Sequence, residues 1–231
     1  MTEPRIRITV DGQPLQVEPA LPLLTALRAL GFPIPGLCHH PRTGEQGRCS
    51  LCIVEVRDRD GWRAEHACLL RCEPGLTVRT VSPHIHQLRS WAARLLLARG
   101  PFNEPAVEVM LRAVLAAAEK GDNGGQYPDA ALPPLSADGT DAATPAMPPG
   151  CILCGRCIGM CTGIGKNKLA FLGRGKRLRI GYVHGPSDTG ACGTCHACRG
   201  VCPTGFIRSN GQAAFSARLY RRRGVPRNNG D

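Results

Sequence analysis

The chain has 231 residues, 42% hydrophobic and 20% charged, which excludes a disordered chain and allows one large or two small domains. Its formal net charge is +11, and the excess of positive charge comes from residues 151–231, where 14 Lys and Arg stand against two acids. No apolar stretch is long enough to span a membrane, and residues 1–10 lack the apolar core of a signal peptide. We therefore expect a cytoplasmic protein whose 13 cysteines stay reduced and serve metal or redox chemistry.

Residues 1–82 predict a small α+β domain. Apolar and polar residues alternate along its strands, and Asp11-Gly12 and Asp60-Gly61 are typical of hairpin turns. Leucines recur at helical spacing between Pro22 and Gly31. The expected elements are strands at 6–10 and 15–17, a helix at 22–31, a hairpin at 53–67 and a last strand at 76–80.

Four cysteines of this domain have a spacing that suits a [2Fe–2S] cluster: Cys38, Cys49, Cys52 and Cys68. Two close and two distant cysteines on a mostly β scaffold are typical of plant-type ferredoxins, although those have a shorter first gap. His39 and His40 suggest Rieske-like ligation instead, but no second Cys–His pair occurs. Cys72 could also ligate in place of Cys68, although a plain thiol is the preferred interpretation.

Residues 83–120 predict a helical segment with two amphipathic helices. Apolar residues recur at helical spacing along both. The first is expected to be lined by Ile85, Leu88, Ala92 and Leu95, and the second by Val107, Met110, Leu111, Val114, Leu115 and Ala118. Residues 121–150 contain five Gly and six Pro but no Lys or Arg, which predicts a linker.

Residues 151–215 carry one cysteine motif twice, Cys-x2-Cys-x2-Cys-x3-Cys. Such gaps let three thiolates converge on one [4Fe–4S] cluster, while the fourth cysteine reaches the other cluster. The predicted ligands are Cys151, Cys154, Cys157 and Cys202 for one [4Fe–4S] cluster and Cys192, Cys195, Cys198 and Cys161 for the second. Two zinc sites would leave half of these cysteines unexplained. The sequence Cys192-x2-Cys195-His196 also matches the motif for c-type haem attachment. Attachment of haem there would require export of the protein and would remove two cysteines from a complete cluster motif.

Residues 216–231 form a basic tail, which we expect to dock on an acidic face of a partner subunit. Nucleic acid is the weaker interpretation of this charge, because aromatic residues make up only 4% of the chain and no nucleic-acid-binding motif occurs. No dinucleotide fingerprint or phosphate-binding loop occurs either. These absences favour electron transfer without a substrate site.

The cysteine motifs resemble those of a known family. Residues 38–80, with Gly47-Arg48-Cys49-Ser50-Leu51-Cys52, resemble the ferredoxin domain of the large iron–sulfur subunit of respiratory complex I. The segments at 151–157 and 198–205 are similar to its [4Fe–4S] domain. A chain of this length most resembles the small diaphorase iron–sulfur subunit of cytoplasmic NAD-reducing [NiFe] hydrogenases.

This resemblance implies an α+β fold with a plant-type ferredoxin-like (β-grasp) domain at 1–82 and a bacterial 2[4Fe–4S] ferredoxin-like domain at 151–215. It implies an electron-transfer subunit without catalysis of its own. The expected partners are a flavin- and NAD-binding diaphorase subunit, which carries FMN and NAD, and a hydrogenase. The same role in an NAD-linked formate dehydrogenase or another dehydrogenase, and a stand-alone ferredoxin-like carrier, remain alternatives.

One departure from the family concerns a further [4Fe–4S] cluster. The family typically binds it with a His-x3-Cys-x2-Cys-x5-Cys segment between the two domains. No cysteine occurs here between Cys72 and Cys151. We therefore expect three clusters in the chain, one [2Fe–2S] and two [4Fe–4S].

Overall fold

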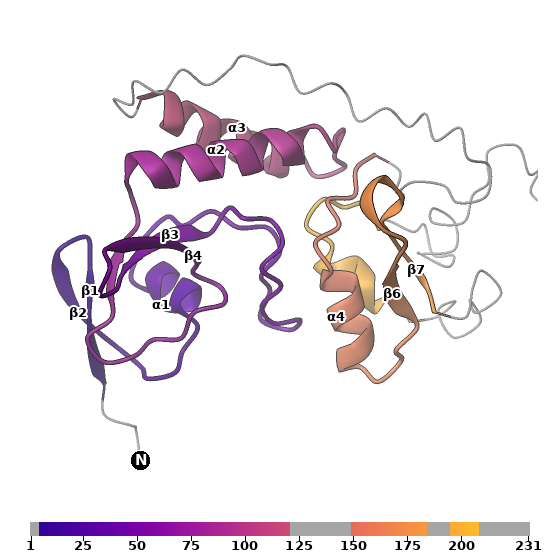
Figure 1. The fold of residues 1–231 in the computed structure, drawn as a ribbon. Coiled ribbons are helices and arrows are strands. Elements are labelled where there is room, and N and C mark those ends of the chain that lie inside the picture. The colour runs from indigo at the N-terminus through magenta and orange to yellow at the C-terminus, as the bar shows by residue number, and fades with distance from the viewer. Residues whose placement is uncertain (1–4, 121–148, 184–194, 208–231) are drawn as a thin grey trace, which may run out of the picture.

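The computed structural model describes residues 5–120, 149–183 and 195–207 (Figure 1). Nearly all of the expected linker, Cys192 and the basic tail at 216–231 lie outside the described residues. The strands are β1 (Ile6–Val10), β2 (Gln13–Val17), β3 (Ile53–Arg57), β4 (Trp62–His66), β5 (Thr77–Arg79), β6 (Leu169–Leu172) and β7 (Arg179–Tyr182). The helices are α1 (Leu23–Ala29), α2 (Pro83–Leu97), α3 (Pro105–Lys120) and α4 (Arg156–Gly163), with short 3-10 turns at Gly175–Arg177 and Ala197–Val201.

The N-terminal part forms a five-stranded mixed sheet in the order β2-β1-β5-β3-β4. β1 runs parallel to β5, and the other neighbours are antiparallel. The hairpin turn between β1 and β2 has φ of 48° at Asp11 and 82° at Gly12, as the Asp-Gly pair predicts. The Asp11 carboxylate then accepts hydrogen bonds from the Thr80 amide at 2.7 Å and hydroxyl at 2.6 Å, which ties this turn to the end of β5.

Alternation along the strands buries one face of the sheet under α1. Alternate residues of β1 and β3 and the leucines of α1 make up this core, since strand side chains alternate between faces. Its fully buried members include Ile8, Val10, Leu23, Leu24, Leu27, Val54 and Val78. The first amides of α1 donate to the loop after β4, from Leu24 to Ala67 O and from Leu23 to Leu70 O, both at 2.9 Å. The helix therefore fixes the loop that carries Cys68.

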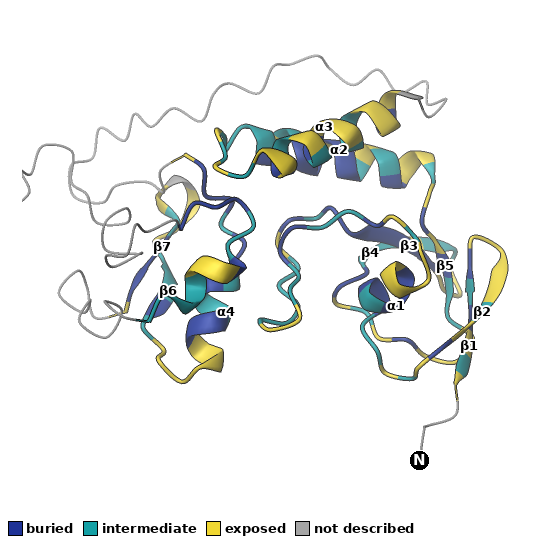
Figure 2. Cartoon of the chain, turned by 180° about the vertical axis from the view of Figure 1, so that it is seen from behind, coloured by how far each residue is buried: buried dark blue, intermediate teal, exposed yellow. Residues whose placement is uncertain are grey.

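α2 and α3 pack against each other, and α2 lies beside β3 (Figure 1). α2 begins with Pro83 in its first turn, and the Ser82 hydroxyl accepts a hydrogen bond from the Ile85 amide at 3.1 Å. The expected apolar stripe of α2 is wrong at one position, because Leu95 is 56% exposed. Arg89 is buried instead, because its guanidinium donates to the carbonyl of Ile53 from Nε at 3.2 Å and from Nη2 at 2.6 Å. Figure 2 shows this buried side of α2 turned towards the sheet.

The C-terminal part packs α4 against a two-stranded antiparallel sheet, β6–β7, that no pattern in the sequence predicted. Tyr182 and Ile180 of β7 and Leu169 of β6 are buried with Phe206 and with cysteines of α4. The β6–β7 hairpin therefore covers one side of the C-terminal cysteines.

The loop between α2 and α3 is bonded to the C-terminal part. Arg99 Nε donates to the carbonyl of Cys151 at 2.9 Å, and the Asn103 side chain donates to the carbonyl of Gly205 at 2.9 Å. The amides of Asn103 and Glu104 both donate to the carbonyl of Thr204, at 3.1 and 3.2 Å. The helical hairpin thereby joins both halves of the molecule. Of the helices in the described ranges, none is long and apolar enough to cross a membrane.

Candidate functional site

The four N-terminal cysteines predicted as ligands are all buried. Cys52 and Cys68 belong to the α1 core, whereas Cys38 and Cys49 lie in an apolar cluster with α2 and α3. All four are less than 5% exposed. Cys38 and Cys49 sit in the loop between α1 and β3, Cys52 directly precedes β3, and Cys68 follows β4. The sheet therefore brings together cysteines that are 30 residues apart in the chain.

The loop around these cysteines presents backbone amides to their sulfurs. The Leu37 amide donates to Cys49 Sγ and the Arg48 amide to Cys38 Sγ, each at 3.4 Å. Gly47 permits this close wrapping, because its φ is 59° and a Cβ there would lie 2.7 Å from Leu69 Cδ1. Amides aimed at sulfur favour a thiolate or a metal-bound sulfur.

The thiols also interact with one another. The neighbouring Cys38 thiol, followed by burial, raises the pKa of Cys49. The Cys68 thiol lowers the pKa of Cys52. At Cys68, the Cys38 thiol lowers the pKa and the Cys52 thiol raises it, and with burial the result is about 11. Cys38 thus adjoins both Cys49 and Cys68, and Cys68 adjoins Cys52, so the four thiols form one group that fits the ligands of a single cluster.

Cys72 and the two histidines take no part in this group of thiols. Cys72 is 2% exposed inside the α1 core, and burial alone raises its pKa. Its amide donates to the carbonyl of Leu21 at 2.9 Å, so it secures the loop to the start of α1. The Nδ1 atom of His40 accepts from the Arg42 amide at 3.1 Å. These contacts favour Cys68 over Cys72 and cysteine over histidine as ligands.

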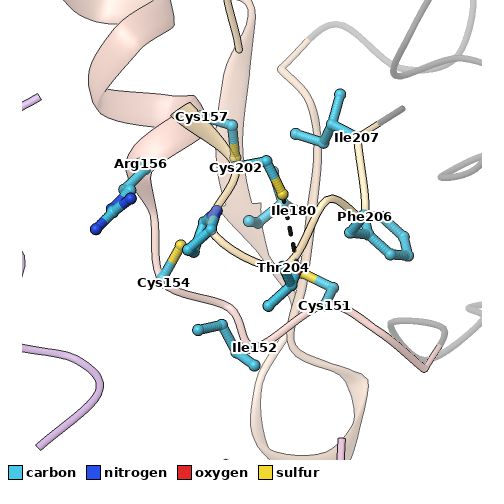
Figure 3. Close-up of a pocket in the computed structure, with 11 residues that line it drawn as sticks. Cys151, Ile152, Cys154, Arg156, Cys157, Ile180, Cys202, Thr204, Phe206 and Ile207 are labelled. Carbon is cyan, nitrogen blue, oxygen red and sulfur yellow. Dashed lines mark hydrogen bonds between the residues drawn. The ribbon is translucent and has the colours of Figure 1, made fainter. Parts of the chain in front are cut away.

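The first C-terminal set surrounds one cavity. Figure 3 shows the sulfurs of Cys151, Cys154, Cys157 and Cys202 turned towards one another, from the segment before α4, from α4 and from the end of the last 3-10 turn. The apolar wall is formed by Ile152, Ile180, Phe206 and Ile207.

Burial raises the pKa of Cys151 and Cys154 to about 12 each and raises that of Cys157 as well. The Leu153 amide donates to Cys151 Sγ at 3.4 Å, while the Thr204 hydroxyl lies 3.6 Å from Cys202 Sγ. Four thiols around one apolar cavity fit a [4Fe–4S] cluster.

The second C-terminal set is described only in part, because Cys192 lies outside the described residues. Cys161 is buried in α4, and its sulfur accepts from the Lys168 amide at 3.2 Å. Cys195 and Cys198 are half-buried. Cys198 lies in the 3-10 turn at Ala197–Val201, which packs against α4, and Cys195 precedes that turn.

The state of the sulfurs agrees with metal binding. All twelve described cysteines are free thiols. Over residues 5–120, 149–183 and 195–207, no three His, Cys, Asp or Glu side chains are grouped to hold one metal ion.

Comparisons with known proteins agree with this geometry. Residues 3–83 match the family described as 2Fe-2S iron-sulfur cluster binding domain. The chain is 29% identical over 216 residues to one of the subunits of the NADH-quinone oxidoreductase of Rhizobium meliloti (strain 1021), covering 88% of this chain and 24% of that protein. It is 28% identical over 228 residues to the mitochondrial NADH-ubiquinone oxidoreductase 78 kDa subunit of Neurospora crassa, covering 93% and 29%.

A solved structure is similar over most of the chain. A chain of the crystal structure of NAD+-reducing [NiFe]-hydrogenase in the H2-reduced state has a TM-score of 0.56 and 27% identity, and the match covers 92% of this chain and 94% of that chain. By contrast, the chain spans about a quarter of the length of the two curated relatives. The predicted resemblance to complex I and to NAD-reducing hydrogenase is confirmed, as is the ferredoxin-like α+β fold of the N-terminal domain.

Proposed function

We propose that this chain is an electron-transfer subunit of an NAD-linked oxidoreductase complex, and that the complex is a hydrogenase. It would hold a [2Fe–2S] cluster at Cys38, Cys49, Cys52 and Cys68. It would hold two [4Fe–4S] clusters, one at Cys151, Cys154, Cys157 and Cys202, and one at Cys161, Cys192, Cys195 and Cys198. Flavin and NAD would bind to a partner subunit, and electrons would pass from there towards a second catalytic unit.

One observation carries the proposal: cysteines from both halves lie in one apolar cluster. Cys38 and Cys49 of the N-terminal loop and Cys154 of the C-terminal segment belong to one cluster with buried residues of α2 and α3. Electron transfer between bound groups needs a short separation and exclusion of water, and a shared apolar cluster favours both. A zinc-stabilised scaffold would not require its two metal sites to share a core.

Bound iron–sulfur clusters supply one-electron chemistry. The residues of this chain bury the ligands, exclude water and aim amides at the sulfurs, for example Leu37 and Arg48 in the N-terminal loop. The cavity at the first C-terminal set is lined by its four cysteines, by apolar side chains, and by Arg156 and Thr204, and a cluster would occupy it. We propose on this basis that substrates bind to the partner subunits and not to this chain.

A quinone-linked NADH oxidoreductase is the second candidate, because the curated relatives are subunits of such enzymes. We favour a hydrogenase because the solved chain is matched over nearly its full length. A formate dehydrogenase and a free carrier would use the same clusters with other partners.

The experiment is purification of the chain from its native host under anaerobic conditions, with identification of the subunits that remain bound. We expect about 10 iron atoms per chain, the sum of one [2Fe–2S] and two [4Fe–4S] clusters. We expect the complex to reduce NAD with H2, and the pure subunit to show no NADH turnover with an artificial acceptor. Iron near 2 per chain, or NADH turnover by the pure subunit, would contradict the proposal.

A further inference from the structure

Arg156 lies between the two cysteine sets and contacts both. It is the first residue of α4 and stands between Cys154 and Cys157 in the chain. Its Nη2 donates to the carbonyl of His39, the residue after Cys38. Its Nη1 donates at 3.4 Å to the carbonyl of Val201, the residue before Cys202. One guanidinium therefore holds backbone groups next to ligands of two different clusters.

The charge of Arg156 is not neutralised by a carboxylate in the described part of the chain. None of the ion pairs found there includes Arg156. Its Nε is shielded from solvent and has no hydrogen-bond partner among the described groups. Arg156 is among the residues that line the [4Fe–4S] cavity, and Figure 3 shows its guanidinium pointing away from the sulfurs. Its bond to His39 places it against the N-terminal loop.

The surrounding cysteines come from both sites. Desolvation lowers the pKa of Arg156, whereas the negative charge of Cys154, Cys38 and Cys49 would raise it. These sulfurs are therefore close enough for electrostatic interaction with one guanidinium. An oxidised cluster with four thiolates carries a charge of about −2, so two such groups would repel each other without a cation between them.

We propose that Arg156 is a positioning residue that fixes the [2Fe–2S] site against the neighbouring [4Fe–4S] site and stabilises the reduced form of both. Its two carbonyl contacts hold the ligand loops, and its charge offsets the negative charge that each cluster gains on reduction. This inference rests on the proposed function, because it requires clusters at both cysteine sets.

The test compares Arg156→Gln with the unsubstituted full-length chain, both loaded with clusters, by iron analysis and redox titration monitored by electron paramagnetic resonance. We expect unchanged iron content and a shift of the midpoint potentials of the [2Fe–2S] cluster and of one [4Fe–4S] cluster to more negative values. The matched control is Arg112→Gln, which removes an exposed cation paired with Glu108 and should leave both potentials unchanged. Unchanged potentials in Arg156→Gln, or a shift of the [4Fe–4S] potential alone, would overturn the inference.

Arg156→Lys provides the second variant. An ammonium keeps the charge but cannot span the carbonyls of His39 and Val201, so we expect shifts in the same direction and smaller than for Gln. If the Gln variant loads no clusters, the potentials of the Lys variant test the inference instead. Wild-type potentials for both clusters in the Lys variant would show that the double contact is unnecessary and would overturn the positioning role. Absence of [2Fe–2S] and [4Fe–4S] signals in the unsubstituted chain would instead contradict the proposed function.

Discussion

Gly155 shows at the scale of one residue how closely the two halves approach. Its φ is 81°, and a Cβ there would lie 2.8 Å from Gln46 Oε1 and 3.3 Å from the Phe171 ring. The guanidinium of Arg48 stacks over the same ring at 4.0 Å from its centre. A side chain at residue 155 would therefore strain the backbone, because of its positive φ, and would push aside the side chain of Gln46 and the Phe171 ring.

We predict that Gly155→Ala destabilises the protein by about 1–3 kcal/mol, because a left-handed conformation and a close contact are both penalised. The measurement is urea denaturation of the cluster-loaded chain. Gly163→Ala is the matched control, because Gly163 ends α4 and a Cβ there meets no atom within 4 Å. Equal stability of the two variants would contradict both the left-handed conformation and the close contact at residue 155.

Cys68 and Cys72 differ by four positions and have opposite expected roles. We predict that Cys68→Ser removes the [2Fe–2S] signal in electron paramagnetic resonance, because its thiol adjoins those of Cys38 and Cys52. Cys72→Ser should keep that signal, because the side chain of Cys72 lies in the α1 core. The reverse result would make Cys72 the fourth ligand.

At the scale of the element, α2 is positioned by a buried charge as well as by apolar packing. Burial lowers the pKa of Arg89 to about 10, while Cys52 and Asp11 favour its charged form. Arg89 therefore stays protonated at neutral pH and holds α2 to β3 through the carbonyl of Ile53. This contact fixes the helix that covers Cys38 and Cys49.

We predict that Arg89→Ala destabilises the protein by about 1.5–3 kcal/mol, the usual loss for a charged donor to a buried acceptor. Leu95→Ala on the same helix should change stability by less than about 0.5 kcal/mol, because Leu95 is exposed. Thermal unfolding of both variants measures the difference. A larger loss of stability for Leu95→Ala than for Arg89→Ala would support the apolar face that the sequence predicted for α2.

At the scale of the whole molecule, iron binding and folding should depend on pH in opposite ways. The cluster-free protein keeps Cys151 and Cys154 protonated, since burial raises each pKa from 9.0 to about 12. Their contribution to stability is complete below pH 9.0 and is lost as the pH rises towards about 12, because only the unfolded thiols ionise in that range. Iron must displace these protons, so its binding strengthens as the pH rises.

We therefore predict that a chelator removes iron faster at about pH 6 than at about pH 8, while the cluster-free chain loses thermal stability above about pH 9. Absorbance during chelation and thermal unfolding of the cluster-free chain measure the two trends. The same pH trend in both experiments would contradict the assignment of these buried thiols as ligands.

The local sequence determined much of this molecule. Alternation and the Asp11-Gly12 pair predicted β1 and β2, and the leucines after Pro22 predicted α1, because these signals act between residues close in the chain. Cysteine spacing likewise grouped Cys151, Cys154 and Cys157 around one cavity, since two-residue gaps bring such side chains to one place. The identity of the clusters at these sites remains a prediction.

Only the tertiary structure decided what depends on contacts across the chain. Helical periodicity favoured Leu95 over Arg89 at the core, because a sequence does not show that the carbonyl of Ile53 needs a donor. The strands β6 and β7 are short and show little alternation, so the sequence did not predict their pairing. The hairpin is recognised only in the tertiary structure, where it packs against α4. The place of Arg156 between two cysteine sets depends on His39, which is 117 residues away in the chain. Such contacts arise from the packing of the two halves, which no local pattern encodes.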